Sequence, residues 1–253
     1  MPDQIDKDFL TTFARGLEVI RSFDAASPSM TLTQVAAKNG LSRASARRFL
    51  LTLQKLGYMS CEAKNFKLTA KVLDLGYAYL SSLNFSDTLS PFLESVTHQL
   101  EESCSATVLD GQEVVYIARI PRRGLVPISL QIGARLPAFA TSSGRVLLAA
   151  LSEVRLEQFL QQLTFAQHTA YTLPAASLLA KIQQVRLQGF AIVDQELELG
   201  MRAVSVPVYD RSQQVRFAIS ISCHVSSYSI EEIEQQFVPL LQHTALQISD
   251  ALS

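Results

Sequence analysis

One segment near the start of the chain restricts the fold more than any other, because it joins a short helix, a tight turn and a capped basic helix. Val35 and Ala36 fall on one face of a helix predicted over about residues 33–39. The Asn39-Gly40 pair then supplies the residues that a helix end and a tight turn favour. Ser42 is a suitable N-cap for a further helix that runs to about residue 56. This order predicts a helix-turn-helix.

The helix that follows Ser42 has an apolar face and, opposite to it, a basic face. One stripe is apolar and is expected to pack inward; it consists of Ala46, Phe49, Leu50, Leu53 and Leu56. The opposite arc is basic and holds Arg47, Arg48 and Lys55, with Arg43 at its edge and Leu51 as the one apolar exception. Arginines at the N-terminal end of a recognition helix reach base edges or phosphates in the major groove. A solvated basic face is the alternative, which we would favour for an isolated helix. The helix, turn and cap together favour DNA.

The flanking residues complete a winged helix-turn-helix over residues 1–68. An amphipathic helix is predicted at residues 8–23, and two short strands at residues 58–61 and 65–68 form a hairpin. Lys64 and Lys67 in this hairpin are expected to meet the phosphate backbone, although the hairpin can equally be a cover for the helices. The full set predicted to contact DNA is Thr33, Ser42, Arg43, Ala44, Ser45, Arg47, Arg48, Lys64 and Lys67.

The distribution of charge agrees with a nucleic-acid partner for the first part. Residues 1–70 hold ten Lys and Arg against six Asp and Glu, a net charge of +4, whereas residues 71–253 hold twelve against seventeen, a net charge of -5. A basic module attached to an acidic one suits a chain whose first part meets a polyanion. Lopsided charge is common in proteins, so this pattern supports the motif and does not replace it.

The rest of the chain divides into a connector and a larger domain. Residues 69–84 are expected to form a linker helix that is apolar almost all round, which must therefore be covered by another part of the protein or by a second subunit. Residues 85–253 alternate short strands and helices, which predicts an α+β domain with a mainly antiparallel sheet. Strands are predicted at residues 106–109, 114–118, 125–130, 191–193, 203–209 and 215–223; helices are predicted at residues 86–102, 146–151, 156–163, 178–187 and 231–252.

Two segments of the larger domain suggest a small-molecule site. Residues 137–145 form a loop of small residues that opens into a helix, whose N-terminus could hold a carboxylate or could simply be capped by Ser142 or Ser143. In the strand at residues 217–223, bulky side chains alternate with Ala218, Ser220 and Ser222. The small, hydroxylated face of that strand either borders a cavity or faces solvent.

Several classes of protein are not favoured by the sequence. No run of eighteen apolar residues predicts a membrane span, and the acidic N-terminus does not resemble a signal peptide. Three widely spaced cysteines suggest a reducing cytoplasm, and four isolated histidines show no metal-ligand spacing. No cofactor motif is found, so we expect no cofactor and no enzyme. The acidic run at residues 194–200 is expected to be a solvated loop.

The whole chain resembles the IclR family of bacterial regulators, which have a winged helix-turn-helix and a GAF-like effector domain. The resemblance rests on residues 13–20, 41–50, 56–58, 135–138, 141–145 and 194–202, which occur in the family's order. The recognition helix and residues 75–83 are most similar to the β-ketoadipate-pathway branch, which responds to protocatechuate or 4-hydroxybenzoate. The resemblance implies a homodimer or a dimer of dimers on an inverted-repeat operator, controlling genes of aromatic-compound catabolism.

The resemblance also implies where an effector binds. It places the site at Ser142, Ser143, Val193, Met201, Ala203, Ser220 and Ser222. Val193 and Ala203 stand where some members that bind small acids have an acidic residue and a cysteine, which favours a flatter, less polar ligand such as an aromatic acid. Arg119 is the first candidate for the effector carboxylate, with Arg135 and Arg202 in reserve. The alternatives are a regulator that senses a short aliphatic acid and a GAF-like thiol redox enzyme using Cys104 or Cys223.

Overall fold

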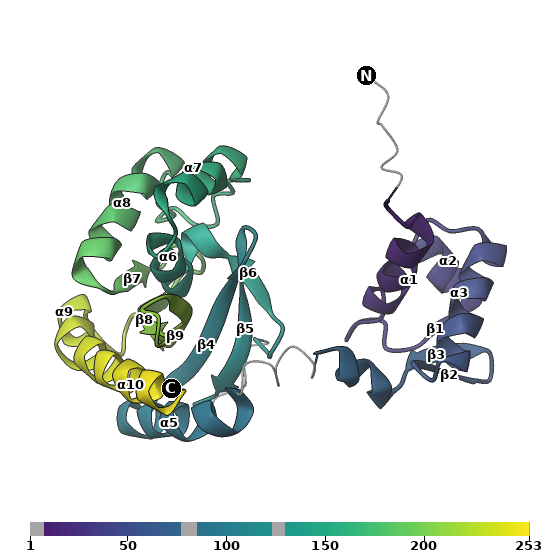
Figure 1. The fold of residues 1–253 in the computed structure, drawn as a ribbon, viewed down its shortest axis with the longest axis horizontal. Helices are drawn as coiled ribbons and strands as arrows, with labels where there is room; N and C mark the ends of the chain where they lie inside the picture. Colours follow the sequence, from purple (N-terminus) through teal and green to yellow (C-terminus); the bar gives the residue numbers. More distant parts are fainter. Residues whose placement is uncertain (1–7, 77–84, 123–129, 253) are drawn as a thin grey trace. The chain divides into compact units, whose positions relative to one another are not determined.

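A computed structural model describes residues 8–76, 85–122 and 130–252. The chain separates into two compact units, Met1–Ser82 and Leu83–Ser253 (Figure 1). Each unit has its own hydrophobic core, so each is described by itself. No helix among the described residues is long and apolar enough to cross a membrane.

The first unit is a winged helix-turn-helix, as predicted. Its helices are α1 (Thr11–Arg21), α2 (Leu32–Lys38) and α3 (Arg43–Lys55). Its sheet has the order β1-β3-β2, formed by β1 (Met30–Thr31), β3 (Asn65–Leu68) and β2 (Met59–Glu62). The core combines one or more side chains from every helix, including Val19, Val35, Ala46 and Leu50. The strand β1 was not predicted, because two residues are too few to show an alternating pattern.

Local sequence explains where these helices begin and end. The hydroxyl of Ser42 accepts a hydrogen bond from the Ser45 amide, which confirms Ser42 as the N-cap of α3. The helix α2 starts earlier than predicted because Thr31 and Gln34 form a capping box. Gly40 follows α2 with φ of +59°, a conformation that glycine adopts without the strain a side chain would bring.

The connector is described only in part. A 3-10 turn, η1 (Ala70–Val72), leads into helical residues up to Gly76, and the remainder of the predicted linker helix lies outside the described residues. Leu73 and Leu75 in this stretch are 72% and 52% exposed within the chain. The described residues therefore leave these two leucine side chains largely uncovered. Of the strand predicted at residues 125–130, all but the last residue also lies outside the described residues.

The second unit contains a six-stranded sheet in which every neighbouring pair of strands is antiparallel. Its order is β6-β5-β4-β9-β8-β7, formed by β6 (Arg135–Pro137), β5 (Glu113–Ile120), β4 (Ser103–Asp110), β9 (Val215–His224), β8 (Met201–Tyr209) and β7 (Ala191–Asp194). The expectation of an α+β domain with a mainly antiparallel sheet is confirmed.

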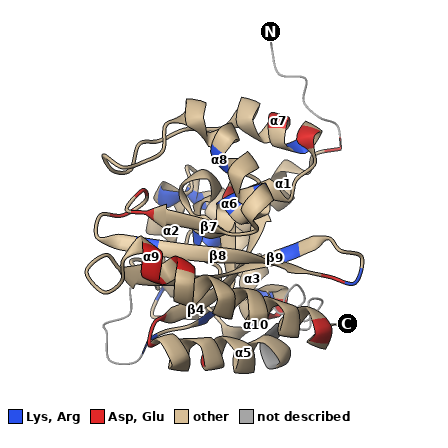
Figure 2. Cartoon of the chain, turned by 90° about the vertical axis from the view of Figure 1, so that its left-hand side faces the viewer, with Lys and Arg blue, Asp and Glu red and all other residues tan. Residues whose placement is uncertain are grey.

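Helices cover both faces of this sheet. The helices α5 (Phe85–Leu100) and α10 (Val238–Ala251) lie on one face, and α6 (Ser142–Ala149), α7 (Glu153–Gln162) and α8 (Ala175–Gln188) lie on the other (Figures 1 and 2). The short 3-10 turn η2 (Ala138–Ala140) precedes α6. We call the sheet face that α6 covers the effector face, because the predicted effector residues of the strands lie on it.

The last helix is not the single α-helix that was predicted at residues 231–252. A short turn, α9 (Ile230–Glu232), passes into the π-helical segment η3 (Ile233–Phe237) before α10 begins. Pro239, in the first turn of α10, has no N–H group and cannot complete the regular α-helical ladder across this point. The π-helical segment lies directly before this proline, and its Ile233 and Phe237 stay buried.

Candidate DNA-binding and effector sites

The arginines of the recognition helix separate onto two sides of α3. Arg43, Arg47 and Arg48 are all exposed, and none of them forms an ion pair with another described residue. At 100° per residue, Arg43 and Arg47 share an arc with Leu51, which is 40% exposed. Arg48 instead borders a groove on the other side of the helix. Arg43 and Arg47 are therefore an exposed pair on one arc of α3, away from this groove.

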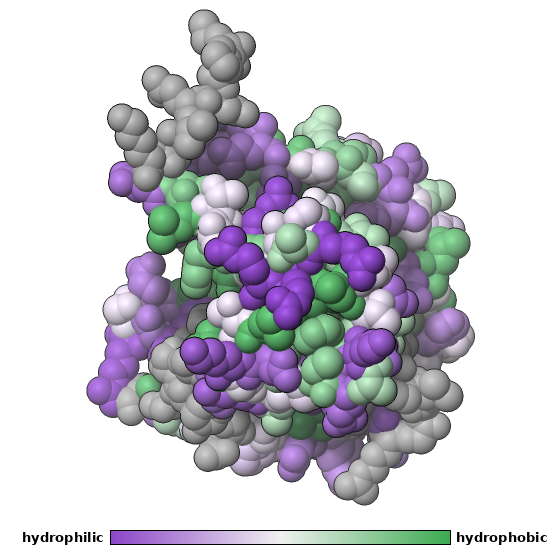
Figure 3. Space-filling view, turned by 90° about the vertical axis from the view of Figure 1, so that its right-hand side faces the viewer, coloured by the Kyte–Doolittle hydropathy of each residue, from purple (hydrophilic) through white to green (hydrophobic). Residues whose placement is uncertain are grey.

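The remaining predicted DNA contacts are also on the surface. Ser42, Ala44 and Thr33 are exposed, whereas Ser45 is half-buried and borders the same groove as Arg48. The Ser42 hydroxyl serves the helix cap, so its lone pairs are partly used within the protein. Figure 3 faces this unit and shows strongly hydrophilic and hydrophobic side chains next to one another on its surface.

The groove beside Arg48 is largely apolar and has a volume of about 720 Å³. Its apolar walls come from α1 and α3 and are lined by Leu10, Phe13, Leu17, Ile20, Phe49, Leu53 and Leu56, with Leu75 from the connector. Leu10, Phe13 and Leu17 are 74%, 68% and 42% exposed. The apolar face predicted for the first helix is thus only partly used by the core of its own unit.

The two lysines of the wing have different surroundings. Ala63 and Lys64 form the two-residue turn of the hairpin, and both have positive φ, +48° and +68°. This turn places Lys64 at the exposed tip of the wing. Lys67 lies on β3 and its ammonium pairs with the Glu62 carboxylate at 2.9 Å. Lys64 is consequently the more available of the two for a phosphate.

The predicted effector residues of the strands share one face of the sheet. Antiparallel partners point to the same side, and the register pairs Val193 with Ala203 and Ala203 with Ser222. A neighbouring row crosses five strands in the order Ala191, Ser205, Ser220, Ser105 and Arg119. Met201 pairs with His224 at the end of the same face. Six of the eight predicted positions thus lie on one face of the sheet, spread over the strands from β7 to β5, and Ser142 of α6 meets this face at Ser205. The eighth, Ser143, is buried in α6.

The start of α6 is fixed by contacts that differ from the prediction. Thr141, rather than Ser142 or Ser143, is the N-cap, and its hydroxyl accepts from the Gly144 amide. Ser142 is free of that role and its hydroxyl lies 3.0 Å from the Ser205 hydroxyl on β8. Thr141 is the N-cap because its extended backbone places its side-chain oxygen over the first turn. The contact between Ser142 and Ser205 thereby joins the N-terminus of α6 to the hydroxyl row of the sheet.

Sequence reasoning missed four polar residues on or beside this row, namely Ser105, Thr107, Tyr116 and Ser205. All four are at most 7% exposed. A signal for Ser105 and Thr107 is present in the sequence, because hydroxyl residues occupy every second position at 103, 105 and 107 of β4. The predicted strand began only at residue 106, so the alternation was not used.

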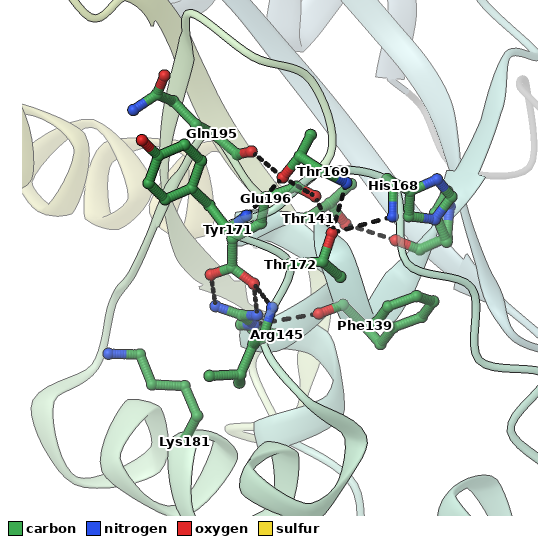
Figure 4. A network of polar contacts seen from close by, with 12 residues as sticks. Phe139, Thr141, Arg145, His168, Thr169, Tyr171, Thr172, Lys181, Gln195 and Glu196 are labelled. Carbon is green, nitrogen blue, oxygen red and sulfur yellow. Dashed lines mark hydrogen bonds and ion pairs between the residues drawn. The ribbon is translucent and has the colours of Figure 1, made fainter.

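A buried ion pair anchors the segment after β7, which corrects the expectation of a solvated loop at residues 194–200. Arg145 is fully buried, and its guanidinium donates to both oxygens of Glu196 at 2.7 and 2.5 Å and to the Phe139 carbonyl at 3.1 Å (Figure 4). The same Glu196 carboxylate accepts from the Leu173 amide at 2.9 Å. A carboxylate so held is a structural group because its lone pairs are already used.

The three arginines considered for an effector carboxylate have different surroundings. Arg135 pairs with Asp110 and Glu113, each at 2.6 Å, and these contacts raise its pKa. Arg202 pairs with Asp194 at 2.8 Å and also donates to the carbonyls of Val225 and Tyr228. Arg119 donates to the Ser105 hydroxyl at 3.3 Å and forms no ion pair with a described residue. Arg119 is thus the candidate whose charge is least compensated.

The thiols do not have the character of redox nucleophiles. Burial raises the pKa of Cys104 and of Cys223 to about 12, so at neutral pH on the order of one thiol in 10⁵ is a thiolate. Both face away from the effector face, since they alternate with its serines along β4 and β9. Within the described residues no group of three or more His, Cys, Asp and Glu side chains is placed to hold a metal.

Comparison with known proteins covers nearly the whole chain. The pattern of the IclR helix-turn-helix domain matches residues 12–60, and that of the bacterial transcriptional regulator IclR C-terminal domain matches residues 77–250. The Pca regulon regulatory protein of Pseudomonas putida is 42% identical over 238 residues, which are 93% of this chain and 82% of that protein. The p-hydroxybenzoate hydroxylase transcriptional activator of Acinetobacter baylyi is 33% identical over 94% of this chain and 90% of its own length.

Solved structures agree in fold. A crystal structure from Rhodococcus sp. RHA1, described as a transcriptional regulator, superposes with a TM-score of 0.86 and 42% identity over 96% of this chain and 98% of that one. A double mutant of the Acinetobacter PobR inducer-binding domain, crystallised with 3-hydroxybenzoic acid, superposes with a TM-score of 0.61 and 28% identity. It covers 65% of this chain and 97% of its own.

Proposed function

The chain belongs to the IclR family of bacterial transcriptional regulators, and on that premise we propose that it is a one-component switch whose DNA binding responds to a small aromatic carboxylate. The observation that carries the proposal is the row of buried hydroxyls between α6 and the sheet, which ends at the uncompensated Arg119. The regulated genes in this proposal are those of aromatic-compound catabolism by the β-ketoadipate pathway, and the protein works in the cytoplasm without enzymatic activity.

DNA binding is assigned to the exposed basic face of α3 and to the wing. Arg43 and Arg47 contact base edges or phosphates in the major groove, and Lys64 contacts the backbone beyond it. Thr33, Ser42, Ala44 and Ser45 contact DNA from the helix N-termini, and at Lys67 a backbone phosphate competes with the Glu62 carboxylate for the ammonium group. Arg48 contributes less than Arg47 because it borders the apolar groove.

The effector is assigned to the face of the sheet beneath α6. Its carboxylate pairs with Arg119, since Arg135 and Arg202 already have carboxylate partners. Ser142 and Ser220 supply hydroxyls, and Val193 and Ala203 make the part of the face farther from Arg119 apolar. Ser143, Met201 and Ser222 complete the set. The 3-hydroxybenzoic acid bound by the PobR inducer-binding domain supports this class of ligand.

A second copy of the chain is the proposed partner. The groove between α1 and α3 leaves Leu10 and Phe13 mostly exposed, and Leu73 and Leu75 of the connector are exposed as well. Apolar side chains gathered in this way are normally covered by another protein surface. Two copies joined here would present two recognition helices to an inverted-repeat operator, either as a dimer or as a dimer of dimers. Residues 69–84 form the connector in this proposal, between residues 1–68 and residues 85–253.

Ligand-dependent melting of the full chain tests the effector class. A ligand that binds only the folded state stabilises it by about 2.7 kcal/mol at a hundredfold excess over Kd. We expect protocatechuate or 4-hydroxybenzoate to raise Tm, and pyruvate and glyoxylate at the same concentration to leave it unchanged. Stabilisation by the short aliphatic acids alone would replace the aromatic effector with the aliphatic alternative. Arg119→Met serves as the matched variant, which should abolish the shift without lowering the Tm of the free protein.

A further inference from the structure

One side chain beside the hydroxyl row is buried without a hydrogen-bond partner. Thr107 on β4 is 0% exposed, and its hydroxyl makes no hydrogen bond within the part of the chain that the structure describes. Only Thr97 on α5 shares this property among the described side chains. A buried hydroxyl that is left unpaired costs free energy, so such groups commonly mark the place of a water or a ligand.

The register shows where the Thr107 side chain points. It pairs with Ala218 on β9, which belongs to the core beneath α6, and with Tyr116 on β5. Antiparallel partners point to the same side, so Thr107 lies on the effector face. It stands one same-face step along β4 from Ser105, a distance of about 6.6 Å for two residues of a strand. Thr107 is therefore a near neighbour of the row that ends at Arg119.

Arg119, at the end of the row, and Thr107, beside the row, suit different groups of a ligand. Arg119 carries a positive charge and suits a carboxylate, whereas the neutral Thr107 hydroxyl can both donate and accept. The step between Thr107 and Ser105, which accepts from Arg119, is comparable to the separation of the two polar ends of a hydroxybenzoate. Tyr116 pairs with Thr107 and lies three residues before Arg119 on β5.

We infer that Thr107 is the residue that selects a ring hydroxyl, so that the protein favours hydroxylated aromatic acids over unsubstituted ones. The inference rests on the proposed effector and deepens it, because it divides recognition between two positions on the face. Arg119 holds the carboxylate, and the Thr107 hydroxyl gains its missing partner from the phenolic oxygen. An acid without that oxygen leaves Thr107 unpaired, as it is in the free protein, and therefore gains no affinity at this position.

Two valine variants of the full chain test this assignment. Thr107→Val removes the hydroxyl and keeps the shape, and Thr97→Val is the matched control because its unpaired hydroxyl lies on α5, on the other face of the sheet. Calorimetric titration gives Kd for 4-hydroxybenzoate and for benzoate with each protein. We expect Thr107→Val to weaken 4-hydroxybenzoate by about tenfold and to change benzoate by less than about twofold. Thr97→Val is expected to change neither.

The melting temperatures of the ligand-free proteins give a second, independent result. Replacing an unpaired buried hydroxyl by a methyl group should leave Tm equal or higher in both variants. A clear drop for Thr107→Val would show that the hydroxyl is already paired in the free protein and would overturn the inference. Equal losses of both acids, or no change for either, would overturn it as well. If the natural chain binds neither acid, it is the proposed function that fails, and the assignment of Thr107 fails with it.

Discussion

The recognition helix α3 and the effector-domain helix α6 begin in much the same way and end up in opposite environments. Both are capped by a hydroxyl residue, Ser42 or Thr141, and both carry arginine within the first turns. Arg47 of α3 is exposed, whereas Arg145 of α6 is 0% exposed and is bound to Glu196. A capped helix with an early arginine therefore does not define an anion site by itself. The surrounding elements decide whether the arginine stays exposed to a ligand or pairs with a buried carboxylate.

Removing Arg145 should have the largest effect. Arg145→Met leaves the Glu196 carboxylate and the Phe139 carbonyl buried without their donor, which is expected to cost about 3–5 kcal/mol of unfolding free energy. Arg15→Met is the control, because the Arg15–Glu18 pair is exposed and such pairs contribute about 0–1 kcal/mol. Denaturant unfolding measures both, and equal losses in the two variants would contradict the buried role of Arg145.

A methyl group at Gly144 should also destabilise α6 strongly. A Cβ at this position would lie 2.0 Å from the Ala138 carbonyl oxygen, so the helix and the turn η2 could not keep their close approach. We expect Gly144→Ala to cost about 1–3 kcal/mol or more. Gly76→Ala is the control, since nothing lies within 4 Å of its added Cβ, and it should melt as the natural chain does. Matching Tm values for the two variants would show that η2 adapts without cost.

Replacing Arg47 on α3 should lower the affinity for DNA and leave the stability of the fold unchanged. Arg47→Ala removes the major-groove contact that we propose and should weaken binding to the promoter fragment by about tenfold, with a salt slope shallower by about one. Arg155→Ala on α7 is the matched control, because Arg155 is exposed near a helix N-terminus capped by Ser152. A fluorescence anisotropy titration compares them. An unchanged affinity for Arg47→Ala would remove α3 from the DNA interface.

The smallest effect concerns pH and contrasts one carboxyl from each unit. Burial raises the pKa of Glu102 more than Arg122 lowers it, whereas Lys38 and the Ser27 amide lower the pKa of the exposed Asp24. A raised pKa favours the folded state below the unfolded pKa of the group, and this contribution is lost as pH rises through the folded pKa. A lowered pKa has the opposite sign.

We therefore expect Glu102→Gln to raise Tm slightly at pH 7, with the gain disappearing near pH 4, where the carboxyl is protonated in the unfolded chain. Asp24→Asn should instead lower Tm slightly at pH 7, and that loss should shrink as the pH falls. Scanning calorimetry at the two pH values measures both. Parallel changes in the two variants would refute the contrast between the buried and the exposed carboxyl.

The sequence predicted the elements of the first unit well because their signals are local. Ser42 is the cap that was expected, and the Asn39-Gly40 turn ends α2 as predicted. The two strands of the wing and every strand of the larger sheet that is described in full were predicted, apart from β6. The family resemblance was confirmed by comparisons over nearly the whole chain. The predicted domain boundaries, at residues 68/69 and 84/85, stay predictions.

The parts that could not be predicted depend on contacts between distant residues. Nothing local to Arg145 and Glu196, 51 positions apart, distinguishes their buried pair from two solvated charges. Thr141 and Ser142 are neighbours, and only the position of Ser205 shows which hydroxyl caps the helix and which faces the sheet. Thr107 is recognisable only after the register of β4 with β9 is known. The residues assigned to DNA and effector binding stay predictions, which the substitutions above test.

A ligand-controlled switch requires coupling between the hydroxyl row under α6 and the exposed arginines of α3. The most direct measurement is the affinity of the full chain for its promoter fragment, at fixed salt, with and without saturating 4-hydroxybenzoate or protocatechuate. We predict that one of these acids changes the dissociation constant by at least about fivefold, in the range typical of coupled sites. An unchanged constant in the presence of an acid that calorimetry shows to be bound would contradict the proposed switch.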